Sequence, residues 1–319
     1  MKNQDLDKLS PEIQQKGLKV MFFGTSNFAL PVLEQLLLNG YSISAVFTGG
    51  GPIEIEAQKH GIKVFKPTSL KKNDDALEKF KLLNPDLCIV AAYGKIIPSS
   101  YMSIPRYGFV NVHPSVLPRY RGPSPVQTAI LNGDTETGAS VMILDQEVDH
   151  GPILGSVKYK ISKTKYNEEI SKEIFELGGK LLIKTLPPYL KNQLIPVEQN
   201  HDQATYSRKF QRQDSKINWN KNVEEIYNQI RSLNPEPGTW ATWKNRILNI
   251  KTGQSSYLEA KLPSIPGTIL RIDNMNNDIA VTTKTCYLIL KQIQLEGGKE
   301  MDAQSFLNGH PDFLGSKLE

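Results

Sequence analysis

The sequence predicts an α/β fold, in which a Rossmann-like domain with a mostly parallel sheet is followed by a small β-barrel domain. Through the first 190 residues, short apolar segments alternate with helical patterns, as is typical of a mostly parallel sheet. Beyond residue 190 this alternation stops, and short strand patterns are separated by Gly, Pro and Asn turns. Such spacing indicates a small barrel.

The elements of the first domain follow from local signals. Lys19–Gly24 is a short apolar segment ending in glycine, which predicts a buried strand. Pro31 suits the first turn of a helix and Gly40 suits its end. Further strands are predicted at 42–47, 62–65, 86–92, 109–113 and 139–144, and helices at 74–83, from about 123, and over about 166–185. In the second domain, strands are predicted at 267–270, 279–281 and 287–295.

These patterns divide the chain into four parts. Residues 1–18 are expected to be a polar tail, since they lack the apolar core of a signal peptide. Residues 19–190 form the predicted first domain, 191–207 a linker, and 208–319 the barrel domain.

Composition narrows the class of protein. The chain has 319 residues, a globular balance of 39% apolar and 22% charged residues, and a net charge of +5. That charge permits an acidic partner such as nucleic acid, but a solvated surface explains it equally well. Only Cys88 and Cys286 occur, so no disulfide framework or Cys-rich metal site is expected, and a reducing cytoplasm is the simplest setting. No apolar stretch is long enough to span a bilayer.

Common cofactor motifs are absent or incomplete. Gly24 follows the first strand, where a dinucleotide fingerprint would begin, but the second and third glycines are missing, which disfavours NAD or FAD. There is no Walker A sequence. The Gly49–Gly51 run favours a flexible loop over a phosphate cradle.

The stretch with the clearest chemistry is the predicted strand at 109–113. Asn111 and His113 are two residues apart, so their side chains project from the same face. Pro114 cannot continue a central strand, which places His113 at the carboxyl end, where open α/β sheets bind ligands. On spacing alone, a strand-end histidine bonded to a loop carbonyl explains the pattern as well.

A carboxylate is predicted to join this pair. The strand ending near Leu144 leads into a glycine-containing loop that carries Asp149 and can return to the same sheet edge. Asn, His and Asp without a nucleophilic Ser or Cys suit direct attack by a substrate amine, with the amide donating to an oxyanion and His and Asp managing protons. Asp145, Glu147 and His150 are neighbours that chemistry alone does not exclude, and no metal-ligand spacing accompanies the His and Asp.

A resemblance narrows this reaction class. The run from Asn111 to Gly122 resembles the core motif of the 10-formyltetrahydrofolate-dependent formyltransferases, and Gly138–Gly151 is similar to that family's second signature. Within the family, the chain resembles the members that formylate methionyl-tRNA. The segments that carry this narrower resemblance are 21–25 with 28–31, 84–94, 217–219, 230–235, and 295–299 with 306–309. The likeness covers nearly everything from residue 19 to the end.

The resemblance implies an OB-like barrel behind a Rossmann-like catalytic domain. It further implies that Asn111 holds the formyl oxygen, that His113 aids proton transfer and oxyanion stabilisation, and that Asp149 orients His113 or relays protons. The donor would be 10-formyltetrahydrofolate and the acceptor the α-amino group of initiator methionyl-tRNA, with no metal or nicotinamide. The segment matching the family's folate contacts consists of Ser115, Val116, Leu117 and Pro118.

Transfer RNA contacts are expected in the second domain. A basic stretch begins near residue 206, and OB-type barrels often bind nucleic acid on their surface. Its first members are the candidate contacts Arg208, Lys209 and Arg212; solvation of a surface is the plain alternative for each. We expect a cytoplasmic monomer with no membrane partner.

Two departures from the family pattern keep other functions open. Members usually carry a long basic loop after the second strand. Here the loop at 48–54 is short, and the first Lys or Arg after the second strand is Lys59. The sequence from Val148 to Pro152 is closer to formyltransferases acting on small molecules. The alternatives are therefore an N-formyltransferase for an amino sugar nucleotide or another small amine, and a folate- or RNA-binding protein without catalysis.

Overall fold

The structure, a computed structural model, describes residues 17–71, 73–256, 265–272 and 278–319, so most of the predicted tail lies outside it. The chain forms two compact units, and neither is continuous in sequence. Unit 1 contains the described residues up to Pro123 together with Thr137–Lys160 and Ser171–Tyr206. Unit 2 contains Ser124–Glu136, Ile161–Ile170 and the described residues from Ser207 onward. The domain boundaries expected from the sequence, at residues 18, 190 and 207, remain a prediction.

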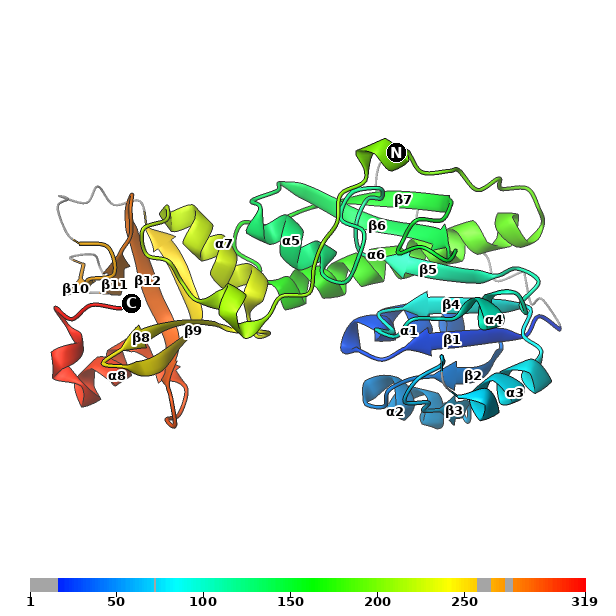
Figure 1. Ribbon diagram of the computed structural model, residues 1–319, viewed down its shortest axis with the longest axis horizontal. Helices are drawn as coiled ribbons and strands as arrows, with labels where there is room; N and C mark the ends of the chain where they lie inside the picture. Colours follow the sequence, from blue (N-terminus) through cyan, green and yellow to red (C-terminus); the bar gives the residue numbers. More distant parts are fainter. Residues whose placement is uncertain (1–16, 72, 257–264, 273–277) are drawn as a thin grey trace. The chain divides into compact units, whose positions relative to one another are not determined.

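Unit 1 is built on a seven-stranded sheet in the order β3-β2-β1-β4-β5-β6-β7, which runs from bottom to top in Figure 1. The five strands from β3 to β5 are parallel, and β6 is antiparallel to β5. The strands are β1 (Val20–Gly24), β2 (Ile43–Phe47), β3 (Lys63–Phe65), β4 (Leu87–Ala91), β5 (Phe109–His113), β6 (Glu136–Ile143) and β7 (Ile153–Lys160).

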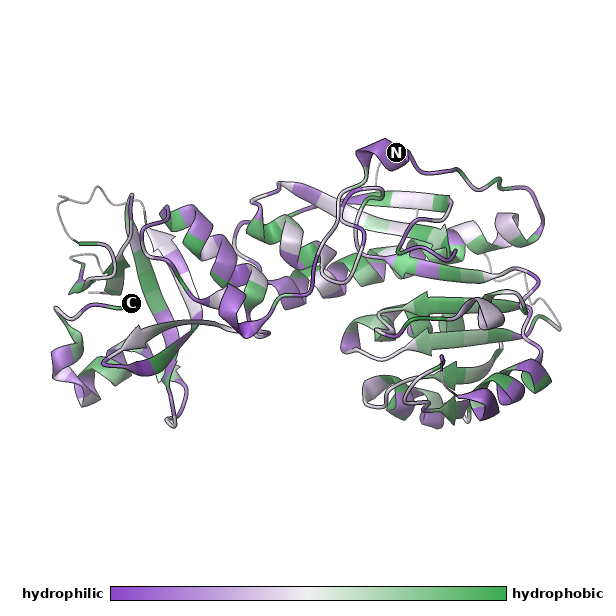
Figure 2. Cartoon of the chain, in the orientation of Figure 1, coloured by the Kyte–Doolittle hydropathy of each residue, from purple (hydrophilic) through white to green (hydrophobic). Residues whose placement is uncertain are grey.

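Apolar side chains cover both faces of this sheet, as a parallel sheet requires. One core joins Phe22, Val110 and Val112 to helical residues, and the other joins Phe23, Phe47 and Phe109 on the opposite face. Figure 2 shows β1, β2 and β4 coloured as hydrophobic along their length. The helices of this unit are α1 (Leu30–Leu38), α2 (Pro52–Lys59), α3 (Asp74–Leu83), α4 (Ser99–Met102) and the greater part of α6 (Asn167–Leu190).

Helix α6 can lie close against β5 because it has a glycine, Gly178, at the point of contact. A Cβ on Gly178 would fall on the Val112 side chain, so a larger residue here would push the helix off the sheet. This packing fixes the side of β5 that faces α6 and leaves Asn111 and His113 on the other side.

Unit 2 is built on an antiparallel sheet in the order β10-β11-β12-β9-β8, with β13 paired to β12. Its strands are β8 (Thr239–Trp243), β9 (Arg246–Ser256), β10 (Ile269–Arg271), β11 (Ile279–Thr282), β12 (Tyr287–Leu295) and β13 (Met301–Asp302). Apolar side chains from these strands and from helices α7 (Val223–Leu233) and α8 (Ala303–Gly309) form the hydrophobic core of unit 2. Helix α7 also packs against α5 (Pro125–Leu131).

The last residues of the chain join the two outer strands of this sheet. Thr242 of β8 exchanges two backbone hydrogen bonds with Glu319, while Ile269 of β10 bonds to Gly315 and Ser316. Both edges are therefore covered by the same segment, which curls the sheet into a barrel-like form. The predicted fold class, a Rossmann-like sheet followed by an OB-like barrel, is confirmed.

Candidate active site

Asn111 and His113 project from one face at the carboxyl end of β5. The strand is paired on both sides, with β4 and with β6, so its backbone is fixed across its length. Asn111 is half-buried and His113 is 3% exposed. The two side chains therefore sit in a rigid frame, with only the amide partly open to solvent.

Each nitrogen of the His113 ring faces an oxygen atom. Nε2 lies 3.0 Å from the carbonyl oxygen of Tyr120, which can only accept, so this nitrogen carries a proton and donates. Nδ1 lies 3.5 Å from Oδ2 of Asp149. The sequence left open whether a loop carbonyl or a carboxylate lies beside His113, and the structure places both there.

Asp149 comes to this face from the loop after β6. Its φ of 48° is in the left-handed region, which a residue with a Cβ seldom adopts. Two residues later the loop returns so tightly that a Cβ on Gly151 would collide with the carbonyl oxygen of Ile143. The loop is therefore folded back on the end of β6, and this turn carries Asp149 towards β5.

The carboxylate of Asp149 meets three groups. The backbone N–H of Gly122 donates to Oδ2 at 2.8 Å, the Asn111 amide lies 3.5 Å from Oδ1, and His113 lies 3.5 Å from Oδ2. The first is a firm hydrogen bond, and the other two are longer than ordinary ones, a distance at which catalytic contacts often stand before substrate binds. The structure brings Asn111, His113 and Asp149 together.

The neighbouring acids and histidine are engaged elsewhere. Asp145 pairs with Nδ1 of His150 at 2.6 Å, and Glu147 lies 4.0 Å from Nε2 of the same ring. His150 in turn stacks on His201, with ring centroids 4.0 Å apart. Asp149, and not Asp145, is the carboxylate beside Asn111.

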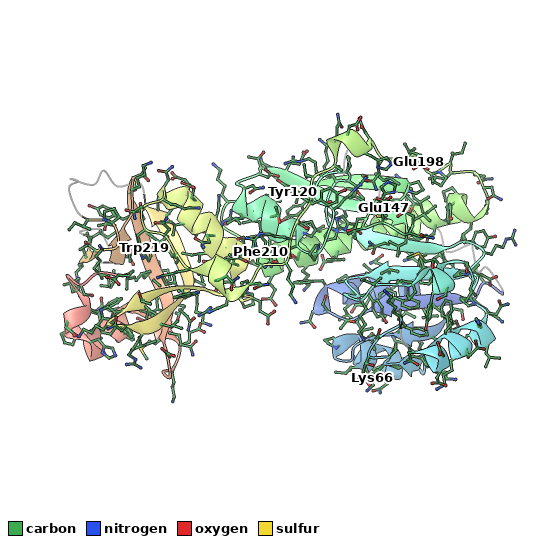
Figure 3. The ribbon with its side chains drawn as sticks, in the orientation of Figure 1. Lys66, Tyr120, Glu147, Glu198, Phe210 and Trp219 are labelled. Carbon is green, nitrogen blue, oxygen red and sulfur yellow. The ribbon has the colours of Figure 1, made fainter. Side chains whose placement is uncertain are left out.

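The sequence reasoning missed the groups that surround this trio. Tyr120 and Gly122 contribute backbone groups to His113 and Asp149, and Gln199 donates to the Asp149 carbonyl from what was expected to be a linker. Figure 3 labels Tyr120, Glu147 and Glu198, which belong to these segments or adjoin them in the chain. Gln199 lies 50 residues from Asp149 in sequence, so no local pattern could have found it.

The segment from Ser115 to Pro118 is mostly occupied by internal contacts. Ser115 is fully buried and its hydroxyl donates to the Arg119 carbonyl at 2.6 Å, while the Leu117 N–H donates to Ser140 at 3.0 Å. Leu117 is 5% exposed, whereas Val116 and Pro118 are half-buried. Within this segment, side-chain surface for a ligand is offered by Val116 and Pro118.

The three basic candidates in unit 2 differ in their surroundings. Arg208 forms a two-point contact with Asp214 at 2.7 and 2.9 Å, which lowers the pKa of that carboxyl to about 2. Arg212 donates to the Pro237 and Gly238 carbonyls and to Asn249 and lies over the Trp240 ring, and burial lowers its pKa. Lys209 is exposed.

Two family models match this chain, and both describe the same family. A family model described as formyl transferase matches residues 18–186, more than half of the chain, and one described as formyl transferase, C-terminal domain, matches residues 209–311. The chain belongs to the formyl transferase family. The trio at the end of β5 and the barrel thus fall in the two regions that define the family.

Among relatives, the chain is 36% identical over 305 residues to a methionyl-tRNA formyltransferase of Geobacillus sp. (strain WCH70), covering 92% of this chain and 94% of that protein. Among solved structures, it is similar to the methionyl-tRNA formyltransferase of Clostridium thermocellum, with a TM-score of 0.56, 20% identity, and coverage of 75% and 94%. It is also similar to an N-formyltransferase from Helicobacter canadensis in complex with folinic acid and dTDP-3-aminofucose, with a TM-score of 0.64, 20% identity, and coverage of 89% and 100%. The two solved structures establish the shared fold.

Two further observations concern only the described residues. None of their helices combines the length and apolar character required to cross a bilayer. They also contain no cluster of three or more His, Cys, Asp or Glu side chains arranged to hold a metal ion.

Proposed function

We propose that this formyl transferase moves the formyl group of 10-formyltetrahydrofolate onto the α-amino group of initiator methionyl-tRNA. The observation that carries the proposal is the gathering of Asn111, His113 and Asp149 at one strand end in a chain 36% identical to a methionyl-tRNA formyltransferase over nearly its whole length. Folate supplies an already activated formyl group, so the chain itself has to bind, orient and manage protons.

The side chains suit those tasks. The Asn111 amide has a second N–H, for which the described part of the chain supplies no acceptor, and it can donate to the formyl oxygen as negative charge develops there. His113 can donate from both nitrogens when it is protonated, which suits a group that takes the proton of the attacking amine. Asp149 faces that ring and balances its charge.

Folate contacts are proposed for the segment that adjoins this trio. Val116 and Pro118 offer partly exposed apolar surface, while the hydrogen bonds of the Ser115 hydroxyl and the Leu117 N–H fix the backbone of the segment. Transfer RNA contacts are proposed for unit 2, with Lys209 as the member of the three candidates best suited to reach a phosphate, and Arg208 and Arg212 in a supporting role.

The relatives weigh against the alternative functions. An amino sugar nucleotide acceptor is favoured by the short loop at 48–54, and the fold alone does not separate the two acceptors. The identity of 36% over 305 residues, which includes the second unit, favours methionyl-tRNA. A pure binding protein has no need for an intact Asn, His and Asp trio.

The setting follows from the proposed substrates. Initiator methionyl-tRNA is a cytoplasmic molecule, so we expect the protein to work in the cytoplasm. Asn111, His113 and Asp149 all belong to unit 1 of one chain, so the chemistry needs no second copy and we expect a monomer.

The deciding experiment offers both acceptors to the purified protein. It is incubated with 10-formyltetrahydrofolate labelled in the formyl group and with either charged initiator tRNA or a panel of amino sugar nucleotides, and the labelled product is isolated. We expect label on methionyl-tRNA alone. Label on an amino sugar would replace the proposed acceptor, and no label on either would refute formyl transfer to both classes.

A further inference from the structure

Gln199 lies where one side chain can control the backbone on both sides of His150. It is 6% exposed, and its Nε2 donates to the carbonyl oxygens of Asp149 at 2.9 Å and of Gly151 at 2.8 Å. A primary amide has two N–H groups, so both are used here. The loop that carries Asp149 is thereby fastened at two points by a single group.

The orientation of this amide is fixed by chemistry. Its Oε1 accepts from Nε of Arg121 at 3.2 Å and from Nη2 at 2.8 Å. A guanidinium can only donate and a backbone carbonyl can only accept, so exchanging the amide oxygen and nitrogen would break all four contacts. Gln199 therefore has one orientation that satisfies all its neighbours.

Arg121 anchors Gln199 in turn. It is 1% exposed, and besides Gln199 it donates to Nδ1 of His201 at 2.8 Å. Its backbone N–H bonds to the Thr205 carbonyl at 2.8 Å, which ties its segment to the one that carries Gln199. The residue after Arg121 is Gly122, whose N–H holds the Asp149 carboxylate.

Asp149 is thus held from both ends. Its carboxylate is bound by Gly122 and its carbonyl by Gln199, and Arg121 joins these two supports. The left-handed φ of 48° persists only where the surroundings impose it, and the two bonds from Gln199 are such a constraint. Without them the Gly122 bond to the carboxylate remains, but the loop backbone on both sides of His150 loses its donor, and we expect the carboxylate to shift relative to His113.

We propose that Gln199 is a positioning residue for Asp149, setting its carboxylate against Asn111 and His113 through the loop backbone. The inference rests on the proposed catalytic role of Asp149. Gln199 acts through that residue, so its loss slows the chemical step and leaves substrate binding unchanged.

The direct test is Gln199→Glu, which has the same size and keeps an oxygen for Arg121 but cannot donate to either carbonyl. Because displacement of a catalytic group by about 1 Å lowers rates by about 10²-fold, we expect kcat to fall about 10- to 100-fold. KM for 10-formyltetrahydrofolate and for methionyl-tRNA should stay within about twofold, since only the chemical step is affected.

Two companions separate the lost bonds from added charge and lost stability. Gln199→Met removes the donors without adding a charge and should show a similar fall in kcat. Gln203→Glu places the same charge on an exposed residue of the same segment and should keep wild-type kinetics. All rates are measured below the onset of thermal unfolding of each variant, so that lower stability does not lower the measured rate.

A double-mutant cycle with Asp149→Ala completes the experiment. If Gln199 acts through Asp149, Gln199→Glu should have no further effect in the Asp149→Ala protein. An equal fall in both backgrounds, a rise in KM with kcat unchanged, or an equal effect of Gln203→Glu would overturn the proposal. If Asp149→Ala is slow while both Gln199 variants are fast, the inference about Gln199 fails alone; if Asp149→Ala is fast, the proposed role of Asp149 fails as well.

Discussion

Two arginine-containing regions of this chain use the same side chain in opposite ways. In unit 1, Arg121 is 1% exposed and its guanidinium donates to Gln199 and His201. In unit 2, Arg208 has 64% of its side chain exposed and pairs with the nearby Asp214. A buried guanidinium fixes geometry because each donor needs a partner, whereas an exposed one is hydrated and contributes mainly charge.

The same contrast extends to the other basic candidates. Arg212 stands between the two cases, since its guanidinium holds backbone carbonyls of the turn before β8 while part of it stays exposed. Lys209 is an exposed cation of the same stretch. Burial, and not residue type, therefore separates the groups that shape the fold from those free to meet an acidic partner.

The largest loss of activity is expected on replacing His113, a buried residue of unit 1. His113→Ala should lower kcat by about 10²- to 10³-fold, because it removes one partner that serves proton transfer and the developing oxyanion. Thermal melting shows whether the variant is folded, and the rate is compared per folded molecule. Near-normal turnover in a folded protein would remove His113 from the proposed mechanism.

Arg121→Ala should lower the free energy of unfolding by about 1–3 kcal/mol, because it leaves the buried amide oxygen of Gln199 without its donors. Arg208→Ala, which breaks an exposed pair, should leave the unfolding midpoint nearly unchanged. Urea unfolding of both variants measures the difference. Equal losses would erase the distinction between the two regions.

A smaller effect is expected for transfer RNA binding. Joint neutralisation of Arg208, Lys209 and Arg212 to Gln should reduce the salt dependence of initiator tRNA affinity, and Lys209→Gln alone should account for one phosphate contact, a slope change of about 0.7–0.9. Affinity is titrated at several salt concentrations. Lys79→Gln on α3, a lysine paired with Asp75, is the matched control. Identical slopes for wild type and the triple variant would argue against these contacts.

The smallest effect concerns acid stability. Hydrogen bonds from Arg208 and from the Gln211 backbone lower the pKa of Asp214 from 3.8 to about 2. A depressed carboxyl pKa contributes stability above the unfolded value and loses it as pH falls towards the folded value. The melting temperature of wild type minus that of Asp214→Asn should therefore be smaller at pH 3 than at pH 5. A difference independent of pH would show that the pair contributes nothing through ionisation.

The sequence alone was sufficient for elements whose signals are local. The parallel strands have continuous apolar segments, and Pro31 and Gly40 bracket α1 as predicted, with Pro31 in the first helical turn and Gly40 just past its end. The alternating strand β7 was not predicted, and α7 was treated only as part of a basic stretch. Helix α7 is buried against α5, a partner far away in sequence. Strand β7 pairs with the strand just before it but has a single buried position, Leu154, so its apolar signal is weak.

At the site, the period of two along β5 was enough to place Asn111 and His113 on one face, because side-chain alternation is a property of any strand. The resemblance was needed to choose Asp149 over Asp145, since both follow the same strand. Only the tertiary structure decided that Gly122 and Gln199 bind Asp149 and that Arg121 binds Gln199, because those contacts join residues 27 to 78 positions apart. Backbone groups also carry no residue signature, so a site built on the Gly122 N–H and the Tyr120 carbonyl becomes visible only once the chain is folded.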